Sequence, residues 1–173
     1  DTCDALSSHQ TRERKLEILK DSHTGAFAII CCGLYLLVFF ACWSEVAAAG
    51  RAALVLALGP VLSRSLSGLF AVTLPNARGT GLLATFTDTM DTAKARGVMV
   101  IWVVACVAAM LWLDLWTGGA ALLGAGLACL YYRVMSQRQF GGVTGDLAGF
   151  FLQICELAMV LMVAVVQKIE VLV

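Results

Sequence analysis

The feature that most constrains this chain is an uncharged, apolar stretch of nineteen residues, 25–43. As a helix it would be about 28 Å long, which is enough to cross the hydrocarbon core of a bilayer. Four further apolar stretches follow, at residues 52–74, 97–113, 118–132 and 147–166. The sequence therefore predicts an all-α, polytopic integral membrane bundle of about five transmembrane helices in a single membrane domain, 1–173, with a short interfacial helix before them.

The composition also indicates that lipid is the main solvent. Of the 173 residues, 60% are hydrophobic and only 14% are charged, and the mean hydropathy is +0.86. These values lie outside those of an average soluble domain. The net charge is zero, so no basic field indicates a nucleic-acid partner. The seven cysteines form no CxxC pair, and six of them lie in apolar stretches, so we expect small, buried apolar side chains rather than a disulfide framework or a zinc site.

The positions of the basic residues predict how the bundle is oriented. Nine Lys and Arg residues lie in the N-terminal segment 1–24 and in the loops 75–96 and 133–146. Five spans bring these segments to one side of the membrane, whereas only Arg51 and Lys168 lie on the other. The positive-inside rule then assigns the first side to the cytoplasm.

Two clusters on that side have the residue types of a phosphate or metal site. Gly141, Gly142 and Gly145 would let the backbone approach a ligand closely, and Asp146 follows where a helix would begin. Asp1 and Asp4 are three residues apart, so a helix would present both carboxylates on one face, where they could hold a divalent cation.

Residues 11–20 (TRERKLEILK) predict the short interfacial helix. Its apolar residues would rest on the membrane surface, whereas its basic residues would face the lipid headgroups. The apolar set is Leu16, Ile18 and Leu19, and the basic set is Arg12, Arg14 and Lys15.

Two charged residues, Arg64 and Glu156, fall inside the predicted spans. Each would cost about 2.5–3.5 kcal/mol at the centre of the bilayer, so each requires a partner or water. Both lie about 15 Å from the predicted cytoplasmic ends of their helices, at about 1.5 Å per residue. Equal depth allows a structural ion pair, or a cavity in which Arg64 receives a substrate phosphate.

Together these clusters resemble the cobalamin synthase (adenosylcobinamide-GDP ribazoletransferase) family. The sequence DTCD at 1–4 is similar to the end of the family segment DGxxDTxDG, and LEILKDSHTG at 16–25 is similar to LEIMKDSRxG. LPNAR at 74–78, with Gly81 and Leu82, resembles PxAR…GL, and GGVTGD at 141–146, with Gly149 and Glu156, resembles GGxTGDxxG…E.

The chain departs from the family pattern in several places. Ala5 replaces a Gly, His23 replaces the usual Arg, and Ala28 stands where Gly is common. The first DG of the pattern and the spans before it are absent. We therefore expect this chain to be a fragment whose activity depends on the complete protein.

The resemblance implies a Mg²⁺-dependent transfer late in cobalamin (vitamin B12) biosynthesis, in the assembly of the nucleotide loop. A ribose hydroxyl of α-ribazole, or of its 5′-phosphate, attacks adenosylcobinamide-GDP, and GMP leaves. The enzyme would be a multi-pass protein of the bacterial inner membrane with its active face in the cytoplasm. Its partners would be these substrates and the bilayer, with either a homo-oligomer or an association with the N-terminal part of the protein.

The resemblance also implies roles for individual residues. The catalytic residues would be Asp21, Asp146 and Lys20, and the Mg²⁺ ligands would be Asp1, Asp4, Asp21 and Asp146. Substrate would be bound by Arg78, Gly141, Gly142 and Gly145, with contributions from Ser22, Arg64 and Glu17. We expect Asp4, Asp21 and Asp146 to surround one common ion.

Two other functions compete with this one. A CDP-alcohol phosphotransferase also uses aspartates at a cytoplasmic membrane face, but its pattern requires DGxxAR followed by GxxxDxxxD. Here Ala5 follows Asp4, and the sequence contains no GxxxDxxxD. A transporter or scaffold could use Arg64 and Glu156 in an ion path, but the outer halves of the spans are nearly uncharged.

Overall fold

The computed structural model describes residues 1–21, 23–47, 49–79 and 91–172. Its helices, in chain order, are α1 (Thr2–Ser7), α2 (Arg12–Ile18), α3 (Ala26–Glu45), α4 (Gly50–Thr73), α6 (Thr92–Leu113), α7 (Leu115–Met135), the π-helix η1 (Ser136–Phe140) and α8 (Gly145–Leu172). Five of these segments are long and apolar enough to cross a membrane. The predicted all-α membrane bundle is confirmed, and the chain is a multi-pass membrane protein.

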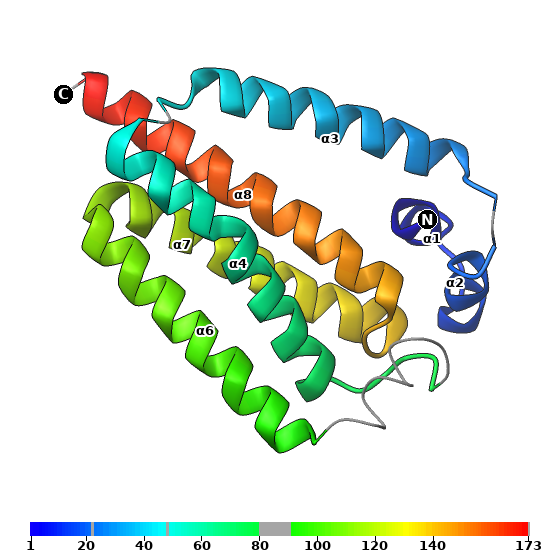
Figure 1. The fold of residues 1–173 in the computed structure, drawn as a ribbon. Coiled ribbons are helices and arrows are strands. Elements are labelled where there is room, and N and C mark those ends of the chain that lie inside the picture. The colour runs from blue at the N-terminus through cyan, green and yellow to red at the C-terminus, as the bar shows by residue number, and fades with distance from the viewer. Residues whose placement is uncertain (22, 48, 80–90, 173) are drawn as a thin grey trace.

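The helices α4, α6, α7 and α8 pack into a bundle, and α3 lies beside it along α8 (Figure 1). The short helices α1 and α2, the end of α4 and the beginning of α8 gather at one end of the molecule. The C-terminus and the α3–α4 connection lie at the opposite end. The segments that carry the polar motifs therefore share one end of the bundle, which we call the motif end.

Several helices extend beyond the apolar stretches. The helix predicted at 97–113 begins at Thr92, where the Asp91 side chain accepts a hydrogen bond from the backbone N–H of Lys94 (3.2 Å). The helix predicted at 118–132 begins at Leu115, and helical structure continues through η1 to Phe140, across part of the predicted loop 133–146. An apolar stretch ends at the first charged residue, whereas the backbone hydrogen bonds of these helices continue beyond it.

Aromatic side chains form the centre of the bundle near the motif end. The rings of Phe70, Tyr132 and Phe151 lie with centroids 4.9–5.3 Å apart, and they come from α4, α7 and α8. Further along, a Cβ on Gly124 of α7 would lie 2.4 Å from the Ala158 carbonyl oxygen. Only glycine permits so close an approach of α7 to α8. All seven cysteines lie in the described part of the chain as free thiols; Cys42, Cys106 and Cys155 are buried as predicted, whereas Cys32 is exposed.

The predicted exposure of α2 is wrong at two residues. Lys15 is buried, and its ammonium group donates a hydrogen bond to the Gln139 side-chain oxygen of η1 at 2.5 Å. Leu19, predicted to rest on the membrane, is also buried within the protein. This face of α2 is covered because the helix packs on η1, a tertiary contact that an amphipathic pattern does not reveal.

Candidate active site

Two segments far apart in the sequence are joined at the motif end. The backbone N–H of Val143 donates to the Pro75 carbonyl, and the N–H of Ala77 donates to the Val143 carbonyl, both at 2.9 Å. Asn76 and Val143 thus form an isolated parallel bridge. A Cβ on Gly142 would lie 2.1 Å from the Pro75 oxygen, so glycine is needed for this contact. We call this arrangement of residues 75–78 and 141–146 the junction.

Gly141 ends η1 and turns the chain into the junction. Its φ of 73° lies in the left-handed region that glycine adopts without strain. The guanidinium of Arg12 lies directly against its backbone, since a Cβ there would fall 1.7 Å from the Arg12 Cζ. The loop after the π-helix η1 is therefore in contact with a cationic side chain from α2. π-Helical turns are often found at functional sites.

Arg78 and Asp146 form an ion pair across the junction. The Arg78 Nη2 lies 2.9 Å from the Asp146 Oδ2, and the Arg78 side chain is 18% exposed while that of Asp146 is 38% exposed. Asp146 stands in the first turn of α8, where the helix dipole favours a negative charge. The pair places one cationic and one anionic side chain at the same partly accessible position.

A groove of about 810 Å³ opens beside this pair, between α1, α3 and α8. Asp1 and Asp146 line it together with Cys3, Tyr35 and Gln153, and the remaining lining is mainly apolar. Burial raises the pKa of the Cys3 thiol to about 11, so this thiol is neutral near pH 7. The carboxylates therefore set the charge of the groove.

Asp4 holds the beginning of α3. Its Oδ2 accepts a hydrogen bond from the Gly25 N–H at 2.8 Å, and its Oδ1 accepts one from the Ala28 N–H at 3.0 Å. A carboxylate that accepts from the first N–H groups of a helix acts as its cap, even from another element. Both oxygens of this predicted Mg²⁺ ligand are thus engaged in joining α1 to α3.

The predicted residues of the second motif lie on the surface. Asp21 is exposed and accepts hydrogen bonds from the backbone N–H of His23 (3.0 Å) and its ring nitrogen (2.8 Å). These bonds, first that of the backbone N–H, lower the pKa of the Asp21 carboxyl. Lys20 is exposed, and Glu17 pairs with Arg14 at 2.6 Å. Ser22 lies outside the described residues.

The predicted four-carboxylate cage is not assembled. Within the residues that the structure describes, no group of three or more His, Cys, Asp or Glu side chains is placed to hold a metal ion. Asp1 and Asp146 share the groove, whereas Asp4 caps α3 and Asp21 bonds to His23. Two of the four predicted ligands therefore line a common site.

The family can now be established from comparison with known proteins. A family model described as cobalamin-5-phosphate synthase matches residues 1–164. The chain belongs to this family. The resemblance drawn from the motifs is confirmed, and it favours this family over the CDP-alcohol phosphotransferases.

Three relatives of this cobalamin-5-phosphate synthase family member carry the name adenosylcobinamide-GDP ribazoletransferase. The protein from Lachnoclostridium phytofermentans is 41% identical, over 98% of this chain and 64% of its own length. Those from Pseudomonas syringae pv. syringae and Clostridium perfringens strain 13 are 36% and 31% identical, over 95% and 96% of this chain. The chain spans about 64–66% of the length of these relatives. No solved structure matches it.

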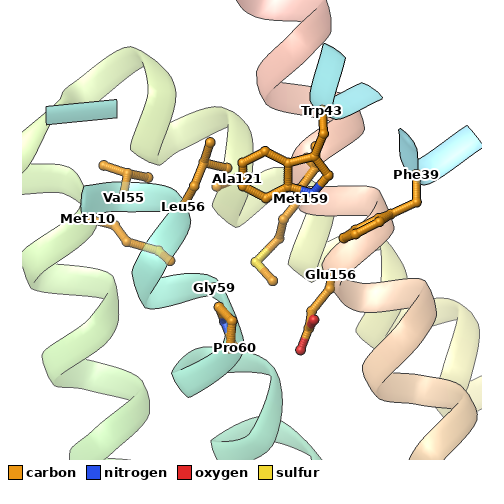
Figure 2. A pocket seen from close by; sticks show the side chains of 11 residues that line it. Phe39, Trp43, Val55, Leu56, Gly59, Pro60, Met110, Ala121, Glu156 and Met159 are labelled. Carbon is orange, nitrogen blue, oxygen red and sulfur yellow. The ribbon is translucent and has the colours of Figure 1, made fainter. Parts of the chain in front are cut away.

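Arg64 of α4 and Glu156 of α8 form an ion pair in which Glu156 is largely buried and Arg64 is exposed at the side of the bundle. The Arg64 Nη1 donates to the Glu156 Oε1 at 2.8 Å, and the Ser63 hydroxyl donates to the same oxygen at 2.8 Å. Figure 2 shows the Glu156 side chain directed towards Gly59 and Pro60, at the edge of a cavity of about 40 Å³. Of the two alternatives, the structure contains the ion pair, and the guanidinium predicted to bind phosphate is engaged by Glu156.

Two residues, one in the junction and one against it, were not predicted to be site residues from the sequence. Asn76 forms the backbone bridge to Val143, and Arg12 covers Gly141. The Asn in the string PNARG is a turn signal, because Asn side chains accept hydrogen bonds from the backbone two residues further on. Arg12 carried no comparable signal, since its position depends on how α2 packs against η1.

Proposed function

We propose that the complete protein is an adenosylcobinamide-GDP ribazoletransferase and that the junction forms part of its active site. The observation that carries the proposal is the Arg78–Asp146 ion pair. The pair joins two of the motifs on which the family resemblance rests, LPNAR at 74–78 and GGVTGD at 141–146. Its Asp146 lines the edge of an open groove. The family match and the shared name of the relatives support the same activity.

The reaction that we propose is a transfer at phosphorus. A ribose hydroxyl oxygen of α-ribazole, or of its 5′-phosphate, forms a bond to the phosphorus that carries cobinamide. The bond from that phosphorus to the oxygen of GMP breaks, and the electron pair leaves with GMP. Arg78 would bind and neutralise phosphate oxygens, and Asp146 would either accept the hydroxyl proton or serve as a ligand of Mg²⁺. Lys20 and Asp21 directly follow α2, which stands at the same end of the molecule, where a substrate of this size could reach them.

The donor set at the groove fits Mg²⁺. Proteins often bind this ion through one or two carboxylates together with phosphate oxygens of the substrate. Asp1 and Asp146 supply two such carboxylates on one groove, whereas Asp4 and Asp21 do not line it. Mg²⁺ held there would neutralise part of the charge on the diphosphate.

We further propose that the motif end faces the cytoplasm of a bacterial inner membrane. The support is the excess of Lys and Arg in the segments that gather there. Both GMP and the nucleotide substrate are highly charged, so a site on the water-exposed end would let them enter and leave without crossing the bilayer. The test introduces a cysteine at position 10 and treats cells with a cysteine reagent that cannot cross membranes. We expect the reagent to label this cysteine only when the cells are permeabilised, so that it reaches the cytoplasmic side.

The experiment that tests the activity uses the complete protein in lipid nanodiscs. Adenosylcobinamide-GDP, α-ribazole and Mg²⁺ are added, and GMP and the corrinoid product are quantified by chromatography. We expect GMP and product in equal amounts, and only when both substrates are present. The proposal would be refuted by the absence of GMP, or by GMP release that does not depend on α-ribazole.

A further inference from the structure

The junction contains buried hydrogen-bond donors that have no acceptor. They are the Asn76 Nδ2 and the Nε and Nη2 of Arg78, and none has a partner among the described residues. The Arg78 Nη2 is close enough to Asp146 for an ion pair, but its N–H groups do not point at the carboxylate. Buried donors without acceptors are costly and rare, and they suggest a bound group or water that completes the site.

The Asn76 side chain is fixed in a defined orientation. Its Oδ1 accepts hydrogen bonds from the backbone N–H groups of Arg78 (3.0 Å) and Gly79 (3.2 Å). Because Oδ1 faces this turn, Nδ2 on the other side of the amide must point away from it. The bridge to Val143 holds the backbone of Asn76 in place as well. The free donor is therefore held in place without any bound ligand.

The two Arg78 donors without a partner among the described residues, Nε and Nη2, are the pair that can bind one anion with two hydrogen bonds. Nε and Nη2 form one edge of the planar guanidinium, and that edge donates two parallel hydrogen bonds to a carboxylate or a phosphate. Asp146 balances the charge of Arg78 but leaves these N–H groups available. The side chain is thus positioned by one anion and able to bind a second.

We propose that Asn76 and the Nε–Nη2 edge of Arg78 together bind one oxyanion, a phosphoryl group of the diphosphate substrate. This inference rests on the proposed function for the identity of the ligand. The family pattern PxAR leaves position 76 open, so the resemblance assigns Asn76 no role. A phosphoryl group has enough oxygens to accept from all three donors, and Arg12 supplies a second cation, whose guanidinium lies against Gly141.

The test measures binding of inorganic pyrophosphate with Mg²⁺ to the complete protein in nanodiscs, by calorimetry. Asn76→Asp keeps a side-chain oxygen that can accept from the N–H groups of Arg78 and Gly79, but it removes the Nδ2 donors and adds a negative charge. Asn76→Ser also keeps an acceptor oxygen and removes the Nδ2 donors, and it adds no charge. Arg78→Lys keeps the charge and removes the two-donor edge. A hydrogen bond to a charged group is worth about 1.5–3 kcal/mol, so each variant should weaken binding by about tenfold or more. Arg51→Lys, at the opposite end of α4, is the matched control and should bind as the wild type does.

The outcomes separate this inference from the proposed function. Unchanged pyrophosphate binding in both Asn76 variants, or no binding by the wild type, would overturn the oxyanion site even if GMP release is normal. Binding that depends on Asn76 in a protein that releases no GMP would support the site and refute the proposed reaction. Melting temperatures of the variants confirm that they are folded, and Asn76→Asp remains informative if Asn76→Ser is unstable.

Discussion

The glycines at the beginning of α8 should respond differently to the same substitution. The family resemblance gives Gly142 and Gly145 one role, a close approach of the backbone to the nucleotide. The structure distinguishes them, because a Cβ on Gly142 would lie 2.1 Å from the Pro75 oxygen and 3.0 Å from the Ala77 nitrogen. Both of these are backbone atoms, so no flexible side chain can move aside. A Cβ on Gly145 would meet no atom within 4 Å.

Gly142→Ala should therefore destabilise the protein itself. Overpacking a tight contact costs about 1–3 kcal/mol, and the backbone bonds between Pro75 and Val143 would also be strained. For a chain of this size, each kcal/mol shifts the melting temperature by about 2–4 °C, so we expect a decrease of about 2–12 °C. Gly145→Ala, which replaces a helical glycine facing open space, should keep or raise the melting temperature.

The assay is thermal unfolding of the complete protein in nanodiscs, followed by its tryptophan fluorescence, together with GMP release. Gly149→Ala serves as a control, because it lies within α8 and also has no atom within 4 Å of its Cβ position. If Gly145→Ala loses activity at an unchanged melting temperature, that glycine contacts substrate. A Gly142→Ala variant as stable as the wild type would refute the proposed packing of the junction.

Two further predictions concern side chains on which the fold depends. Asp4→Ala should lower stability by about 0.5–2 kcal/mol, because the N–H groups of Gly25 and Ala28 lose their acceptor, and thermal unfolding checks it; no change would contradict the cap. Glu156→Gln should destabilise the protein in a bilayer by up to about 2.5–3.5 kcal/mol, since Arg64 loses its charge partner. The double variant Arg64→Gln/Glu156→Gln should lose less than the sum of the single variants, whereas additive losses would show that the two side chains do not interact.

The helices could be predicted from the sequence because the bilayer requires long apolar stretches, and these are visible in the residues. Their ends were less predictable. Lys94 and Arg96 interrupt the apolar pattern, yet α6 begins before both of them. Charged side chains in the first turns of a membrane helix can reach the interface, so hydropathy marks the hydrocarbon core rather than the helix.

The site was predictable in part. The motifs singled out Arg78 and Asp146, and the structure brings these two side chains together. The role of Asp4 could not be foreseen, because it depends on α1 folding back to the beginning of α3. The burial of Lys15 has the same origin, a contact between α2 and η1. Local patterns indicate which residues carry chemistry, but tertiary packing decides which of them meet.

The central claim is that Asp146, at the junction with Arg78, takes part in the transfer. The most direct test compares GMP release by Asp146→Asn with that by the wild type, in the complete protein in nanodiscs. Asp91→Asn is the control, because Asp91 is the exposed N-cap of α6, lies outside the junction and the groove lining, and Asn caps equally well. We predict that Asp146→Asn lowers kcat by at least about 100-fold at an unchanged melting temperature, whereas Asp91→Asn retains activity. Near wild-type turnover in Asp146→Asn would contradict the account.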